Sequence, residues 1–154
     1  MNELLPLSIG VGLAVSLLFS ELFGLAAGGM VVPGYIALHL HRPLDVALTV
    51  GAGVLTFAVV HALASIVILY GKRRTVLMIL VGYLFGALAR AVAAASIADV
   101  ANVDLHLIGY VIPGLIAIWI ERQGFVETMS ALVTASVVVR LVLVLVAGSE
   151  LQVA

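Results

Sequence analysis

Long apolar runs fill most of this 154-residue chain and constrain its fold more than any other feature. Crossing the hydrocarbon core of a bilayer takes roughly 20 apolar residues of helix. Runs of that length occur at about Leu4–Phe23, Leu44–Leu69, Val76–Ile97 and Phe125–Ala147. Charged residues make up 10% of the chain, whereas a soluble domain carries about 25%. The sequence therefore predicts an all-α polytopic membrane protein with four long transmembrane helices, folded as a single membrane domain over residues 1–154.

Charge and residue types exclude several kinds of protein. The formal net charge is −1, which leaves no basic face for nucleic acid. Cysteine is absent, so disulfides, thiolate metal ligands and cysteine nucleophiles are excluded. No phosphate-binding glycine motif occurs, and the spacing of His39, His41 and His106 is not that of a metal site. We predict no catalytic residue, metal or cofactor in this chain.

The basic residues indicate how the chain is oriented. Lys72, Arg73 and Arg74 form one cluster between the second and third runs. The positive-inside rule places this loop, residues 72–74, in the cytoplasm. The start of the chain, Met1-Asn2-Glu3, lacks the basic region of a cleaved signal peptide, so we expect the first run to be retained.

Two short segments, 80 residues apart, are nearly alike in sequence. One contains Pro33 and Gly34 and the other Pro113 and Gly114, each within an apolar run that ends before an arginine. The match indicates an internal duplication with halves of about 1–71 and 75–154, joined by the basic loop. Paired breaks in corresponding halves of a membrane protein point to a functional site.

The two broken segments, Gly24–Leu40 and Leu105–Ile120, allow two topologies. We expect each to be interrupted near its middle by the Pro-Gly pair, and irregular backbone must be buried in protein or line a wet cavity. If the segments are re-entrant, the halves are parallel and both termini are cytoplasmic. If they cross, there are six crossings and the halves are inverted. Their short length slightly favours the re-entrant alternative.

Small residues recur along the expected helices. Ser8, Gly12, Ser16, Ser20 and Gly24 follow one another every four residues, and Gly82 and Gly86 form a GxxxG pair. Such stripes allow close helix–helix approach. Contacts within the chain and contacts in a homo-oligomer both fit this pattern.

Several ionisable residues lie in or beside apolar runs, where charge is costly and usually functional. Glu21 lies near the end of the first run, Arg90 and Arg140 lie about two turns before the ends of the third and fourth, and Arg122 follows the second Pro-Gly segment. The alternative for the arginines is that they reach the headgroups as interfacial anchors.

Taken together, these residues resemble the PgsC/CapC family, the small membrane subunit of bacterial poly-γ-glutamate (capsule) synthases. The resemblance covers nearly the whole chain. It depends on Glu21 with Gly24, Val31-Val32-Pro33-Gly34-Tyr35, Ile68-Leu69-Tyr70-Gly71 with Arg73, Ile108-Gly109, Pro113-Gly114-Leu115-Ile116-Ala117 and Arg122-Gln123-Gly124. His41-Arg42 departs from the family pattern, so no role is carried over to Arg42.

The resemblance implies a multi-pass subunit in the bacterial cytoplasmic membrane. Its expected partners are a cytoplasmic ATP-dependent amide ligase (PgsB/CapB-like), which would bind the ATP and divalent metal, and a membrane-anchored extracytoplasmic subunit (PgsA/CapA-like). The chain would dock the ligase and help pass poly-γ-glutamate outward. Candidates for contact with this polyanion are Arg122, Gln123, Glu21, Arg90, Arg140 and Tyr35; Lys72, Arg73 and Arg74 are candidates for contact with the ligase or anionic lipid.

Two other kinds of protein fit the same pattern. A small repeat-built transporter or channel working alone would need a substrate site between its halves, and a purely structural anchor would leave export to other subunits. An intramembrane enzyme finds no paired carboxylates or Ser/His arrangement here.

Overall fold

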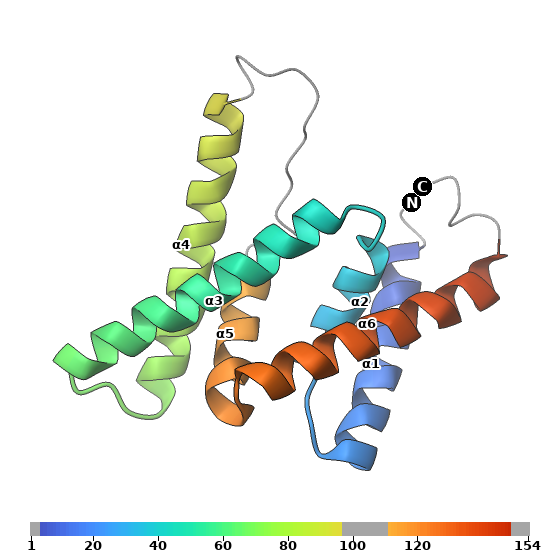
Figure 1. The fold of residues 1–154 in the computed structure, drawn as a ribbon, viewed down its shortest axis with the longest axis horizontal. Helices are drawn as coiled ribbons and strands as arrows, with labels where there is room; N and C mark the ends of the chain where they lie inside the picture. Colours follow the sequence, from blue (N-terminus) through green and yellow to red (C-terminus); the bar gives the residue numbers. More distant parts are fainter. Residues whose placement is uncertain (1–3, 97–110, 149–154) are drawn as a thin grey trace.

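A computed structural model of the chain describes residues 4–96 and 111–148, and its regular elements there are all helices. In chain order they are α1 (Leu4–Phe23), α2 (Val32–Leu38), α3 (Pro43–Ile66), α4 (Lys72–Ser96), α5 (Ile112–Gln123) and α6 (Phe125–Ala147) (Figure 1). Within the described residues, α1, α3, α4 and α6 are long and apolar enough to span a membrane. The predicted all-helical fold with four long candidate spans is confirmed.

Two predicted helix boundaries are wrong. α3 ends at Ile66 rather than Leu69, because Val67 takes extended backbone angles (φ −117°, ψ 135°). α4 begins at Lys72 rather than Val76, so the basic cluster forms a first helical turn and not a loop. The early start of α4 has a simple cause. Hydropathy measures apolar length, whereas Lys and Arg are good helix formers and extend a helix past its apolar part.

The Pro-Gly pair lies at the start of a helix in both short segments, and in the first segment it marks the change from the loop of residues 24–31 to α2. Pro33 and Pro113 lie in the first turns of α2 and α5, where a missing N–H costs no hydrogen bond. The Pro-Gly pair therefore begins each helix instead of breaking it. The part of the second segment before residue 111 lies outside the described residues.

The helices pack in corresponding pairs. α1 packs on α2 as α4 packs on α5, α1 on α6 as α4 on α3, and α2 on α6 as α5 on α3. In Figure 1, α1 and α4 run in opposite directions, as do α2 and α5, and α3 and α6. A shared core joins the two short helices through Val32 and Ile36 of α2 and Ile112, Ile116 and Ile120 of α5. The short helices thus lie at the centre, covered by the long ones.

Close backbone contact marks both crossings of a long helix with a short one. A Cβ added to Gly12 would lie 2.7 Å from the Cα of Gly34. A Cβ added to Gly82 would lie 2.5 Å from the backbone nitrogen of Gly114. The Ser8 hydroxyl donates a hydrogen bond to the Gly34 carbonyl, 2.6 Å away. The predicted small-residue stripes therefore serve packing within the chain at these crossings.

Candidate functional site at the C-terminal end of α5

The last turn of α5, residues 119–123, brings side chains from several elements together. Its C-cap is Gly124, the single residue between α5 and α6, whose φ of 104° favours glycine over any residue with a Cβ. This tight junction fixes the direction in which the last turn faces. Side chains from this turn contact the loop before α2, the first turn of α4 and solvent.

Gln123 binds the loop that connects α1 to α2. The Ala26 N–H donates to Gln123 Oε1 over 3.0 Å, and Gln123 Nε2 donates to the Ala26 carbonyl. The side-chain amide thus pairs with both backbone groups of one residue. Sequence reasoning placed Gln123 among the candidates for polymer contact, but these hydrogen bonds join it to the first half of the chain.

Arg122 lies over the ring of Trp119. Its guanidinium carbon is 5.6 Å from the ring centroid, within the range of a cation–π contact. Gly29 packs against the same indole, since a Cβ placed on Gly29 would lie 3.3 Å from Trp119 Nε1. Arg122 itself is exposed. The geometry therefore presents a positive charge at the surface on a rigid aromatic support.

Arg74 points toward α5 instead of outward. It forms an ion pair with Glu121, and its Nη2 lies 3.4 Å from Nδ1 of His61 on α3. The side chains of Arg74 and Glu121 are each 25% exposed. The three basic residues of the cluster are thus not equivalent, because Lys72 and Arg73 are exposed whereas Arg74 joins α3, α4 and α5.

These contacts bring the ends of three elements together. The ion pair between Arg74 and Glu121 places the C-terminal end of α5 beside the N-terminal end of α4. The hydrogen bonds of Gln123 place the C-terminal end of α1 at the same position, through the loop that follows it. One end of the molecule therefore carries Arg122, Lys72 and Arg73.

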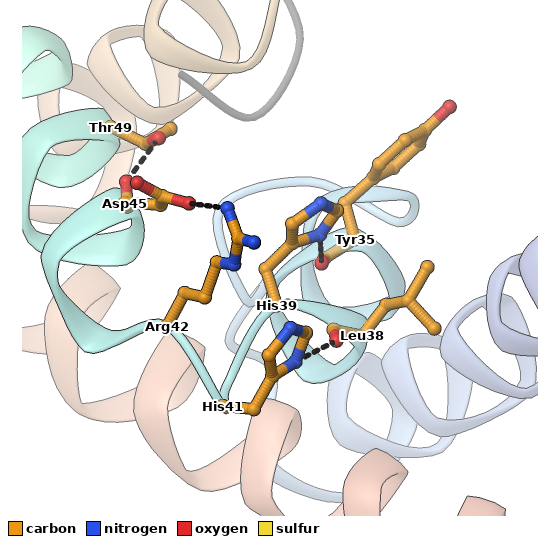
Figure 2. Close-up of polar contacts among 7 residues, drawn as sticks. All are labelled: Tyr35, Leu38, His39, His41, Arg42, Asp45 and Thr49. Carbon is orange, nitrogen blue, oxygen red and sulfur yellow. Dashed lines mark hydrogen bonds and ion pairs between the residues drawn. The ribbon is translucent and has the colours of Figure 1, made fainter. Parts of the chain in front are cut away.

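A second group of polar residues lies at the C-terminal end of α2 (Figure 2). Nδ1 of His39 lies 3.0 Å from the Tyr35 carbonyl, and Nδ1 of His41 lies 3.1 Å from the Leu38 carbonyl. A carbonyl only accepts, so each Nδ1 carries the proton. Nη1 of Arg42 lies 4.0 Å from Oδ2 of Asp45, which is in the first turn of α3. These histidines bind the end of their own helix, as expected of a local polar turn.

The remaining candidates are dispersed. Arg140 of α6 donates a hydrogen bond to the Ala37 carbonyl over 3.3 Å and so stabilises the last turn of α2. Glu21 is exposed in the last turn of α1, and Arg90 is part-buried on α4. Tyr35 is part-buried on α2. The structure therefore brings Arg122 and Gln123 together, with Glu21 at the same end of the molecule, and leaves Arg90, Arg140 and Tyr35 at other places.

Sequence reasoning missed Trp119 and Glu121. A signal for Glu121 was present, because a carboxylate between apolar residues needs a partner. Trp119 had no such signal, since a tryptophan in an apolar helix is ordinarily a packing residue. Among residues 4–96 and 111–148, no group of three metal-ligating side chains occurs.

This fold defines a class of protein: a multi-pass helical membrane protein with two short Pro-Gly helices at its centre. The family model for capsule biosynthesis CapC matches residues 11–129, which is most of the chain. The chain belongs to the CapC capsule biosynthesis family.

Curated relatives agree with this assignment. The chain is 30% identical over 128 residues to the PGA biosynthesis protein CapC of Bacillus subtilis (strain 168), covering 82% of this chain and 85% of the relative. It is 29% identical over 133 residues to the capsule biosynthesis protein CapC of Bacillus anthracis, covering 86% and 88%. No solved structure matches it.

Proposed function

We propose that this chain is the integral membrane subunit of a poly-γ-glutamate synthase and export complex in the bacterial cytoplasmic membrane. It docks a cytoplasmic ATP-dependent amide ligase of the CapB type and helps pass the polyanionic product outward, beside an extracytoplasmic subunit of the CapA type. ATP and a divalent metal belong to the ligase in this proposal. Family membership supports the pathway, and the geometry supports the place of this chain within it.

The observation that carries the proposal is the gathering of exposed cations at one end of the molecule. Lys72 and Arg73 begin α4, and Arg122 ends α5 at the same end. The positive-inside rule makes this the cytoplasmic end. The ligase and the growing chain of carboxylates would meet the subunit there, with Lys72 and Arg73 as contacts for the ligase or anionic lipid and Arg122 as the first contact for the polymer.

Arg122 suits a polymer that must bind and then move on. A guanidinium pairs with a carboxylate through parallel N–H groups, and an exposed pair of this kind is worth only about 0–1 kcal/mol. Weak, repeated contacts of that size orient a polyanion without trapping it. The Trp119 ring holds the charge in position, which reduces the side-chain entropy lost on each contact.

We infer that the short segments cross the membrane rather than re-enter it, and that the halves are inverted repeats. A re-entrant α5 would return to the side where α4 ends, yet its last turn pairs with Arg74 in the first turn of α4. The opposed directions of α1 and α4 in Figure 1 favour the same arrangement. With the start of α4 in the cytoplasm, both termini would be extracytoplasmic.

Both parts of the proposal have direct tests. Since the chain has no cysteine, single cysteines at exposed positions such as Leu7 and Tyr70 would report sidedness by labelling with an impermeant maleimide. We expect Leu7→Cys to react from outside the cell and Tyr70→Cys only after the membrane is opened. The reverse result at Leu7 would restore the re-entrant topology with cytoplasmic termini.

For function, Arg122→Gln should lower polymer output and length several-fold while the ligase still co-purifies with the subunit. Arg122→Lys, which keeps the charge but not the planar fork, should retain part of the output. Unchanged output in Arg122→Gln would support a structural anchor, and polymer transport by the purified chain without a ligase would support a stand-alone transporter.

A further inference from the structure

The loop of residues 24–31 depends on the second half of the chain for its position. It contains Gly24, Gly28 and Gly29, all with positive φ, so its own backbone is not restricted to one shape. Ala27 is fully buried, and Gly28 and Gly29 are buried as well. A buried loop needs partners for its backbone groups, because an unpaired buried N–H or C=O is costly.

Gln123 supplies such partners from α5. Its amide accepts from the Ala26 N–H and donates to the Ala26 carbonyl. Other contacts between the loop and the second half include Gly28 against Leu132 and Gly29 against Trp119. Within the first half, the Ser16 hydroxyl reaches the Gly29 carbonyl at 3.4 Å, the long limit of a hydrogen bond.

The loop continues directly into α2 and lies on the ring that supports Arg122. Gly29 packs against the Trp119 indole, and α2 begins at Val32, three residues later. A change in the loop would therefore reach the central short helix and the surface that presents Arg122. Gln123 precedes the α5–α6 junction, so its backbone is fixed independently of the loop.

We propose that Gln123 is a positioning residue, a polar latch between the two halves of the chain that holds the 24–31 loop closed on α5. Through the loop it keeps the Trp119–Arg122 surface and the start of α2 in place. Its effect on polymer output rests on the proposed function, whereas its effect on the loop does not. This role differs from the direct polymer contact that the sequence suggested for Gln123.

A buried cysteine in the loop reports whether the latch is closed. Ala27→Cys places a small thiol at a fully buried position, and Met30→Cys, at a site 53% exposed, provides the control that reacts in every background. In the purified full-length chain, Gln123→Met keeps the length of the side chain but loses both hydrogen bonds. We expect the Ala27→Cys thiol to react on the order of tenfold faster in that background.

Gln123→Glu gives a readout that a merely structural role would not produce. An ionised carboxylate accepts from the Ala26 N–H but faces the Ala26 carbonyl without a donor; a protonated carboxyl regains that donor. Lowering the pH far enough to protonate this carboxyl should therefore restore protection of the Ala27→Cys thiol. A dipyridyl disulfide still reacts with thiols in acid, and the wild-type amide should show no such restoration.

The outcomes separate this proposal from the proposed function. An Ala27→Cys thiol that stays equally protected in the Gln123→Met and Gln123→Glu backgrounds overturns the latch. A loss of polymer output in Gln123→Met without faster labelling also overturns it, and would mean that Gln123 acts on the polymer directly. Failure of the ligase to co-purify, or normal output in Arg122→Gln, overturns the proposed function and leaves the labelling result unaffected.

Discussion

The two short helices, α2 and α5, begin in the same way and end differently. Each starts with Pro-Gly packed against a glycine of a long helix, Gly12 for α2 and Gly82 for α5. At its end, α2 carries histidines that bind their own helix. The end of α5 instead binds the 24–31 loop and the first turn of α4. At the helix starts, close backbone contact permits only one way for a long helix to cross a short one. At the helix ends, which lie at the surface, side chains can form different contacts in the two copies.

This difference indicates where structure and function lie. The starts of both helices are buried and filled by backbone, so they determine how the long helices cross. The end of α5 gathers exposed charge and binds the 24–31 loop and α4. The end of α2 is bound by its own histidines and by one hydrogen bond from Arg140 of α6. The two short helices thus share one kind of start, and the end of α5 carries the candidate site.

The largest expected effect tests the shared start. Gly12→Ala and Gly82→Ala each force a Cβ against backbone at 2.7 and 2.5 Å. Backbone cannot move aside as a side chain can, so each change should cost about 3 kcal/mol, the upper part of the range for overpacking. Thermal unfolding in detergent measures the loss, and equal losses would confirm that the crossings are equivalent.

Glycines away from these crossings provide the matched control. Gly10 in α1 and Gly51 in α3 have nothing within 4 Å of an added Cβ. Alanine there should leave stability unchanged or raise it by up to about 1 kcal/mol, the helix propensity difference. If Gly10→Ala were as damaging as Gly12→Ala, close approach to α2 would not explain the stripe.

The sequence predicted what depends on composition and periodicity. Apolar length located the four long helices, and the spacing of Ser8, Gly12 and Ser16 located the face that packs on α2 and its loop. Helix ends were less predictable, because charged residues such as Lys72 continue a helix that hydropathy ends. The place of Pro33 also followed tertiary context, since a proline suits a first turn as well as a break.

The contacts of the candidate site could not be predicted in this way. Gln123 and Ala26 are 97 residues apart, and nothing local in either segment indicates that they meet. Arg74 was grouped with Lys72 and Arg73 by adjacency, yet its helical position turns it toward Glu121. Pairings across the chain depend on how the halves dock, which one sequence does not contain.

A smaller effect is expected from the ion pair that distinguishes α5 from α2. Glu121→Gln leaves the Arg74 guanidinium without a charged partner in a setting that is only 25% exposed. A fully buried pair broken this way costs about 3–5 kcal/mol; partial exposure should reduce the loss to about 1–2 kcal/mol. The double variant Arg74→Gln with Glu121→Gln should lose less than the sum of the single changes, as measured by a double-mutant cycle. Strict additivity would contradict a direct interaction.

The end of α2 should respond less. Arg140→Met keeps most of the apolar stem of the side chain and removes the hydrogen bond to the Ala37 carbonyl. The expected loss is about 1 kcal/mol in unfolding free energy, from one hydrogen bond and its interaction with the helix dipole. Polymer output should fall no more than this stability loss explains. A much larger fall, restored by Arg140→Lys, would return Arg140 to the candidates for polymer contact and make the two helix ends functionally alike.

The smallest effect on the unfolding free energy is expected at His41, at the end of α2. Its ring is exposed, its Nδ1 lies 3.1 Å from the Leu38 carbonyl, and it stacks on the His39 ring with the centroids 6.4 Å apart (Figure 2). Water can replace an exposed hydrogen bond, so His41→Ala should change the unfolding free energy by less than about 0.5 kcal/mol. Thermal unfolding beside Glu121→Gln in the same detergent gives the comparison directly. A loss at His41 as large as that at Glu121 would mean that His41 also binds another element, and the asymmetry between the two short helices would not hold.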